Sequence, residues 1–355
     1  MMFNVPKLTQ QYLPQITNKI DQKTKPLGAL GALEQLAMRL AIIQSDRTRQ
    51  WQNIDTLNAQ VIVFAGDHGI ANQGVSIAPS DVTYQMVVNF LNGGAAINCF
   101  CRCHNMPLSV VDTGMCTPLP EALKKQHRNF FESRLGAGTH DISGQAAMTI
   151  AQVNNGLSAG ESIAERAIEQ GCNVLIFGEM GIANTSAASA ITSTLLDIPV
   201  DRSVGLGTGI TTEQLAVKKQ LISQGLTRLK AHKDDVSITT ILAELGGFEI
   251  VHIVGAILAS AKRKVPVLVD GFIVSTAALV AHKIAPEVSD YLIFAHQSHE
   301  HAHQQILEHF HAQPLLQLAL RLGEGTGAAL AFPLLQAAVS FYNDMASFES
   351  AGVTV

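Results

Sequence analysis

Glu324 is the residue whose surroundings point most clearly to chemistry. It stands between two glycines, after the largely apolar run Leu318–Leu322 and before the apolar run Ala328–Phe332. A carboxylate among so many aliphatic side chains should lose part of its hydration, and its pKa should rise toward the range that suits a general base. The flanking glycines leave room for a ligand to approach. The alternative is an ordinary glutamate exposed on a loop.

Glycine-rich segments offer a second chemistry, the binding of an anion. The pattern G-x-G-T-G occurs at 205–209 and again at 323–327, and such loops bring backbone N–H groups close to a phosphate. Only the first precedes a clear predicted helix, 212–229, whose N-terminus would favour negative charge and whose Lys218 would add a cation. The glycine spacing does not fit a dinucleotide-binding loop, and no Gly-Lys pair exists for a Walker A loop. The alternative is a set of ordinary turns.

A third possibility is a zinc site. His299, Glu300 and His303 match the pattern H-E-x-x-H, which is the zinc-binding helix of many metalloproteases. The alternative function is therefore a zinc-dependent hydrolase, with Glu324 as a possible third ligand. Several other histidines crowd this part of the chain, so a chance match is the preferred interpretation, and zinc analysis would separate the two.

Five short runs rich in Val, Ile, Leu and Phe have the composition of buried strands. They are Val61–Ala65, Leu108–Val111, Val174–Phe177, Val267–Val269 and Tyr291–Ala295. A polar residue stands at or just beyond the end of each run: Asp67, Asp112, Glu179, Asp270 and His296. Any one of them is more readily a helix cap or a turn former. Five at equivalent places predict a ligand crevice beyond the carboxyl ends of the strands.

Helical periodicity follows each predicted strand, and this alternation predicts an α/β fold with a doubly wound parallel sheet. The predicted helices are Gln85–Cys99, Glu161–Glu169, Thr212–Leu229, Glu249–Lys262, Ser275–His282 and Gly327–Phe341. Both chain ends look helical. We therefore expect a large α/β domain over 60–300 and a small helical domain made of 1–59 and 301–355.

Composition and charge exclude several classes of protein. Apolar residues make up 47% of the 355 residues, which excludes intrinsic disorder, and the net charge of −5 argues against nucleic-acid binding. The longest apolar stretch, 253–261, is too short to span a membrane. The start of the chain does not look like a signal peptide, and the five cysteines form no disulfide framework. We expect a cytoplasmic protein with free thiols.

Seven segments together resemble the nicotinate-nucleotide–dimethylbenzimidazole phosphoribosyltransferases, a family of cobalamin-pathway enzymes. They are Lys25–Glu34, Phe64–Ile70, Gln85–Asn98, Gly178–Thr185, Gly246–Ile250, Asp270–Ile273 and Leu320–Ala328. The resemblance covers nearly the whole chain. It implies a Rossmann-like parallel sheet, a small helical domain from both chain ends, and a homodimer. It also implies transfer of the phosphoribosyl group from nicotinate mononucleotide to 5,6-dimethylbenzimidazole, with no cofactor.

The resemblance also implies roles for individual residues. Glu324 corresponds to the catalytic base of the family. The nucleotide site would draw on Gly178, Glu179, Gly181, Gly207, Thr208, Gly209, Lys218, Asp270 and Ser298. The benzimidazole pocket would draw on Ala78, Pro79, Met86, Leu320 and Leu322. Leu206 and Gln297 depart from the family pattern, in which arginine is common at both positions.

Overall fold

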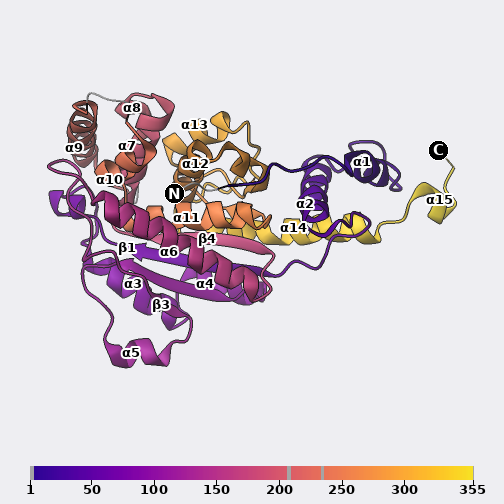
Figure 1. Ribbon diagram of the computed structural model, residues 1–355, viewed down its shortest axis with the longest axis horizontal. Coiled ribbons are helices and arrows are strands. Elements are labelled where there is room, and N and C mark those ends of the chain that lie inside the picture. Colours follow the sequence, from indigo (N-terminus) through magenta and orange to yellow (C-terminus); the bar gives the residue numbers. More distant parts are fainter. Residues whose placement is uncertain (1–3, 206–208, 233–235, 355) are drawn as a thin grey trace.

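A parallel sheet forms the centre of the computed structural model, which describes residues 4–205, 209–232 and 236–354 (Figure 1). Its strands within these residues are β1 (Ala59–Gly66), β2 (Leu108–Gly114), β3 (Phe130–Glu132), β4 (Val174–Met180), β5 (Val267–Val269) and β6 (Leu292–Phe294). They lie in the order β3-β2-β1-β4-β5-β6, and every neighbouring pair is parallel. The predicted α/β class and doubly wound sheet are confirmed. The strand order reverses between β1 and β4, and open α/β sheets bind ligands beyond the carboxyl edge at such a point.

Both faces of the sheet are buried, which explains why its strands read as continuous apolar runs. Ile62 and Phe64 of β1 belong to the hydrophobic cluster on one face, whereas Val61 and Val63 belong to the cluster on the other. The period of two is that of a pleated strand.

Helices cover each face. The cluster that contains Phe64 also includes residues of α6 (Ile150–Glu169), α7 (Asn184–Leu196), α9 (Thr212–Lys230), α10 (Ile238–Leu245), α11 (Phe248–Lys262), α12 (Phe272–Ile284) and α13 (His301–His309). The cluster that contains Val63 includes residues of α1 (Leu13–Asp21), α2 (Ala32–Thr48), α3 (Asp81–Leu91), α4 (Ala96–Cys103) and α14 (Thr326–Asp344). The short elements are α5 (Glu121–Gln126), α8 (Val200–Ser203), α15 (Phe348–Ala351) and the 3₁₀ helices η1 (Gly69–Gln73) and η2 (Pro286–Tyr291). Among the described residues, no helix is both long and apolar enough to cross a bilayer.

Two helix predictions were wrong in extent. The predicted helix Gln85–Cys99 is broken into α3 and α4 by Gly93, whose φ is +79°, and by Gly94, where a Cβ would lie 2.3 Å from the Asn89 Oδ1 atom. Helix α6 begins at Ile150 rather than near Glu161, because Thr149 caps it by accepting the Gln152 N–H. The strand β3 was missed because its three residues, two phenylalanines and a glutamate, contain none of the Val, Ile or Leu residues that marked the other strands.

Helices α1 and α2, the C-terminal part of α14, and α15 lie at the same end of the molecule and extend away from the sheet (Figure 1). An isolated antiparallel bridge joins Lys23 to Ser347. Helix α13 packs elsewhere, since Ala302 and Ile306 belong to the cluster that contains Phe64. The division into 60–300 against 1–59 and 301–355 stays a prediction.

Helices α6 and α11 pack so closely that only glycine fits at their contact. A Cβ at Gly255 would lie 2.0 Å from the Leu157 carbonyl oxygen, and one at Gly160 would lie 1.9 Å from the His252 carbonyl oxygen. The backbones must therefore move apart if either glycine is replaced.

Gly255→Ala should lower the free energy of unfolding by roughly 1–3 kcal/mol, because the added methyl group overpacks the contact. Urea denaturation of the purified protein measures this. Gly144→Ala is the matched control, since nothing lies within 4 Å of a Cβ at that position. Equal midpoints for the two variants would contradict the prediction.

Candidate active site

A cavity opens at the carboxyl ends of β4, β5 and β6, where the predicted crevice should lie. Its wall is formed by residues of the loops after these strands, at 179–185, 270–274 and 296–300, and by 321–323 ahead of α14. Glu179, Asp270 and His296 all line it. Three of the five predicted strand-end residues are thus brought together.

Glu179 is a buried carboxyl group on the cavity wall. The Asn184 Nδ2 atom, in the first turn of α7, donates a hydrogen bond to its Oε2 atom. Burial, followed by the nearby Glu249 carboxylate, raises the pKa of Glu179 to about 8. Glu179 therefore keeps a proton at neutral pH and can donate a hydrogen bond as well as accept one.

Asp270 holds the start of α14. Its Oδ1 atom accepts the Ala328 N–H at 2.9 Å, and the His296 Nε2 atom lies 3.6 Å from the same oxygen. The His296 ring in turn packs on Gly327, where a Cβ would lie 2.0 Å from the His296 Cδ2 atom. A carboxylate at a helix N-terminus is favourably placed. Asp270 thus anchors the helix that follows Glu324.

Glu324 is buried, with 4% of its surface exposed, so the alternative of an exposed loop glutamate is wrong. Its φ of +63° continues a left-handed turn with Gly323 and Gly325 at +84° and +86°. The turn presses against β4, since a Cβ at Gly178 would lie 2.3 Å from the Glu324 carbonyl oxygen. The close approach explains why glycine stands at position 178.

The Glu324 carboxylate meets the beginning of α4. Its Oε2 atom accepts the Ile97 N–H at 3.2 Å. Burial raises the pKa of Glu324 above its ordinary value, while the Ile97 N–H lowers it and the Asp270 carboxylate raises it again. The carboxylate is thus buried, as its aliphatic neighbours predicted, and the upward shift of its pKa is in the direction that suits a general base.

Lys218 is fully buried in α9. Its Nζ atom donates to the Thr185 Oγ1 atom at 2.7 Å, and Thr185 lines the cavity. Burial lowers the pKa of Lys218 to about 8, against the opposing effect of the Glu300 carboxylate. A cation therefore lies directly behind the cavity wall.

The other predicted residues divide into three groups. Gly181, Ser298 and Leu322 line the cavity, and Gly178 lies at the contact with Glu324. Gly207 and Thr208 lie outside the described residues. Gly209 has a φ of +112°, and a Cβ at that position would lie 3.8 Å from a guanidinium nitrogen of Arg321. Ala78, Pro79, Met86 and Leu320 are not part of the cavity wall. The benzimidazole pocket therefore stays a prediction.

The H-E-x-x-H segment does not have the geometry of a zinc helix. His299 is exposed and precedes α13, which begins at His301. His303 is buried, and both its ring nitrogens are engaged, Nδ1 by the Ser298 N–H at 2.8 Å and Nε2 by the Ser275 hydroxyl at 2.9 Å. Across the described residues, no three His, Cys, Asp or Glu side chains are grouped to hold a metal ion. The structure gives the zinc hydrolase no support.

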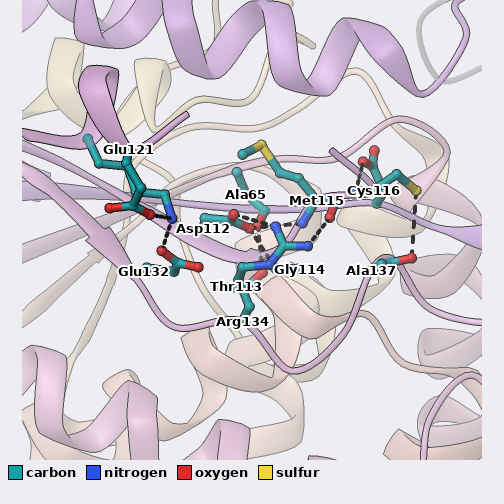
Figure 2. A network of polar contacts seen from close by, with 12 residues as sticks. Ala65, Asp112, Thr113, Gly114, Met115, Cys116, Glu121, Glu132, Arg134 and Ala137 are labelled. Carbon is teal, nitrogen blue, oxygen red and sulfur yellow. Dashed lines mark hydrogen bonds and ion pairs between the residues drawn. The ribbon is translucent and has the colours of Figure 1, made fainter. Parts of the chain in front are cut away.

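Asp112 and Asp67, the other two predicted strand-end acids, do not line this cavity, and both bind backbone N–H groups of the turn after β2. Figure 2 shows Arg134 bonded to the Asp112 carboxylate and to the Met115 carbonyl. The other Asp112 oxygen accepts the Gly114 and Met115 N–H groups. Asp67 accepts the Cys116 N–H at 2.7 Å. Both carboxylates therefore hold the turn after β2, although the Asp67 Oδ1 atom has no hydrogen-bond partner among the described residues.

Three polar cavity residues were not singled out from the sequence, namely Asn184, Thr185 and Arg321, and Glu300 was considered only as part of the H-E-x-x-H pattern. Asn184 and Thr185 end the motif that begins at Gly178, so the signal was present but only Glu179 and the glycines were used. Arg321 lies among aliphatic residues, and the sequence analysis treated it only as a polar residue within an apolar run.

A family model described as a phosphoribosyltransferase matches residues 5–353, so the chain belongs to this family of transferases. A nicotinate-nucleotide–dimethylbenzimidazole phosphoribosyltransferase of Vibrio vulnificus is 55% identical over 98% of this chain and 100% of its own length. The relative of the same name from Shewanella baltica is 51% identical over 99% of this chain and 97% of its own.

A solved structure agrees with these relatives. The crystal structure of CobT from Thermus thermophilus superposes with a TM-score of 0.90, at 41% identity, over 97% of this chain and 99% of that one. The particular family is thus that of the nicotinate-nucleotide–dimethylbenzimidazole phosphoribosyltransferases. The predicted family and enzyme class are confirmed.

The Arg134 contact gives a stability prediction. Burial raises the pKa of Asp112 despite the Met115 N–H and Arg134, which lower it, so the carboxylate is costly to leave without its partner. Arg134→Met should lower the free energy of unfolding by roughly 3–5 kcal/mol, as measured by urea denaturation.

The control for this variant is Lys124→Met. Lys124 bridges the exposed carboxylates of Glu121 and Glu132, also drawn in Figure 2, and such pairs add little stability. We expect its midpoint to match that of the unaltered protein. Arg134→Met with the same midpoint would refute the structural role of this pair.

Proposed function

We propose that the protein transfers the phosphoribosyl group of nicotinate mononucleotide to 5,6-dimethylbenzimidazole, giving α-ribazole 5'-phosphate and nicotinate for the nucleotide loop of cobalamin. The observation that carries this proposal is the buried Glu324 carboxylate, held at the start of α4 beside a cavity lined by Glu179 and Asp270. The relatives named above support the choice of substrates. In keeping with the resemblance, the enzyme would work as a homodimer in the cytoplasm.

The chemistry needs one proton acceptor. The C–N bond of the mononucleotide breaks with its electron pair going to the nicotinate nitrogen, which neutralises the pyridinium and requires little help from an acid. The unprotonated nitrogen of the benzimidazole forms the new bond to the anomeric carbon. The proton on its other nitrogen becomes acidic and passes to a base, for which a single placed carboxylate suffices.

Glu324 fits the role of that base. Burial raises its pKa, which favours acceptance of a proton, while the Ile97 N–H stabilises the carboxylate that must exist before the reaction. The left-handed turn at 323–325 restricts the backbone of Glu324. Its carboxylate is therefore positioned before the substrate arrives.

The cavity suits the nucleotide. The protonated Glu179 carboxyl and Asp270 offer hydrogen bonds to ribose hydroxyls, and Lys218 with Thr185 provides positive charge and a hydroxyl for the phosphate. Departure of nicotinate releases no pyrophosphate, so the step itself has no need of a metal ion.

Glu324→Gln tests the base. Because glutamine cannot take the benzimidazole proton, kcat should fall on the order of 10²–10⁴-fold while the KM for the mononucleotide changes little. Nicotinate release with the benzimidazole as acceptor is the assay. Glu132→Gln, an exposed substitution at the end of β3, serves as the control. Near-normal turnover by the Glu324 variant would show that Glu324 is not the base.

Lys218→Met tests the phosphate contact. Affinity for nicotinate mononucleotide should fall on the order of tenfold, with little change for the riboside that lacks the phosphate. Since burial lowers the pKa of Lys218 to about 8, its charge is present below pH 8 and lost above it, and mononucleotide affinity in the unaltered enzyme should weaken as pH rises through 8.

Isothermal titration with both ligands measures these affinities. Lys219→Met, on the same helix but paired with Asp201 at the surface, is the matched control. Parallel loss for mononucleotide and riboside would show that Lys218 acts on the fold and not on the phosphate.

A further inference from the structure

The start of α4 is held by one side chain, Asn98. Its Oδ1 atom accepts the Ala95 N–H at 3.0 Å, and its Nδ2 atom donates to the Phe90 carbonyl at 2.9 Å. Asn98 is 8% exposed. It therefore ties the first residue ahead of α4 to the last turn of α3, across the break at Gly93 and Gly94.

This clamp determines where the Ile97 N–H points. Ile97 lies between Ala95 and Asn98 in the first turn of α4, where backbone N–H groups have no partner within the helix. The Ile97 N–H is donated instead to the Glu324 Oε2 atom, 227 residues away in the chain. A small rotation of the α4 start would misalign this hydrogen bond.

We propose that Asn98 is a positioning residue for the transfer reaction, holding the start of α4 so that the Ile97 N–H meets the Glu324 carboxylate. This inference rests on the proposed function, because it concerns the state of the proposed base. A hydrogen bond to the charged form of a carboxylate favours ionisation, which opposes the effects of burial and of the Asp270 carboxylate. Asn98 thus favours the ionised form of Glu324, which is the form that can accept a proton.

Other charged groups near Glu324 are left unchanged by a substitution at 98. The Asp270 carboxylate, with His296 next to it, faces Glu324 from the ends of β5 and β6, and Glu179 faces it from β4. On α4 itself, Arg102 bonds to the Gly93 carbonyl. A shift in the pH dependence after Asn98 is replaced therefore reports the Ile97 contact.

Asn98→Ala, followed as kcat/KM against pH, tests the inference. The acid limb should move to higher pH by about one unit, since a weakened hydrogen bond to a charged group changes the ionisation equilibrium roughly tenfold. The two enzymes should differ about tenfold on the acid side and converge at high pH. Asn98→Gln should restore the profile, because glutamine three residues after a helix cap accepts the same N–H. Asn98→Ser replaces the alanine variant if that one does not fold.

Asn129→Ala is the matched control. It loses a similar hydrogen bond, from the Asn129 Nδ2 atom to the Leu108 carbonyl at 3.0 Å, at the start of β2. A profile lowered equally at every pH, or one that superposes on the unaltered enzyme, would overturn the inference. The unaltered enzyme and Glu324→Gln are assayed alongside. Absence of transfer in the former, or an intact acid limb in the latter, would instead refute the proposed function.

Discussion

The contact between β4 and the turn before α14 is the constraint on which the site depends. Gly178 gives the Glu324 and Gly325 backbone room to touch the strand, and the Glu324 N–H returns to the Glu179 carbonyl at 3.3 Å. Asp270 completes the arrangement by accepting the Ala328 N–H. One strand end thus presents Glu179 to the cavity and also supports the turn that carries Glu324, so neither carboxyl group can move alone.

Several buried acids lie at this edge of the sheet, and the protein compensates for their burial in three ways. Glu249 pairs with His68 at 2.7 Å, Asp270 accepts a helix N-terminal N–H, Glu324 accepts another, and Glu179 keeps its proton. Uncompensated charges at such depth would unfold the protein. Burial raises the pKa of Glu179 and of Glu324 among them, and shifted proton affinity is a property that acid–base chemistry requires.

The sequence predicted the sheet because buried parallel strands alternate with helices, a local pattern. It also predicted that Glu324 would be dry, since its aliphatic neighbours are adjacent in the chain. Sequence reasoning could not predict which hydrogen-bond partners the strand-end acids have, because those partners lie elsewhere in the chain. Asp112 and Asp67 bind backbone N–H groups of the turn after β2, and Asp270 caps α14, 58 residues further on. The α3–α4 break was missed because two glycines in an apolar periodic run look like a weak point in one helix.

The two faces of the sheet divide the proposed reaction between them. The cavity is walled by loops leading into α7, α12 and α13, all on the face that contains Phe64, whereas the Glu324 carboxylate meets α4, on the face that contains Val63. The segment 321–325 passes between them along the carboxyl edge. A displacement that converts a β- into an α-linked base requires the leaving and entering heterocycles on opposite sides of the ribose. A nucleotide in the cavity, with the proton acceptor on the α4 side, is compatible with that requirement.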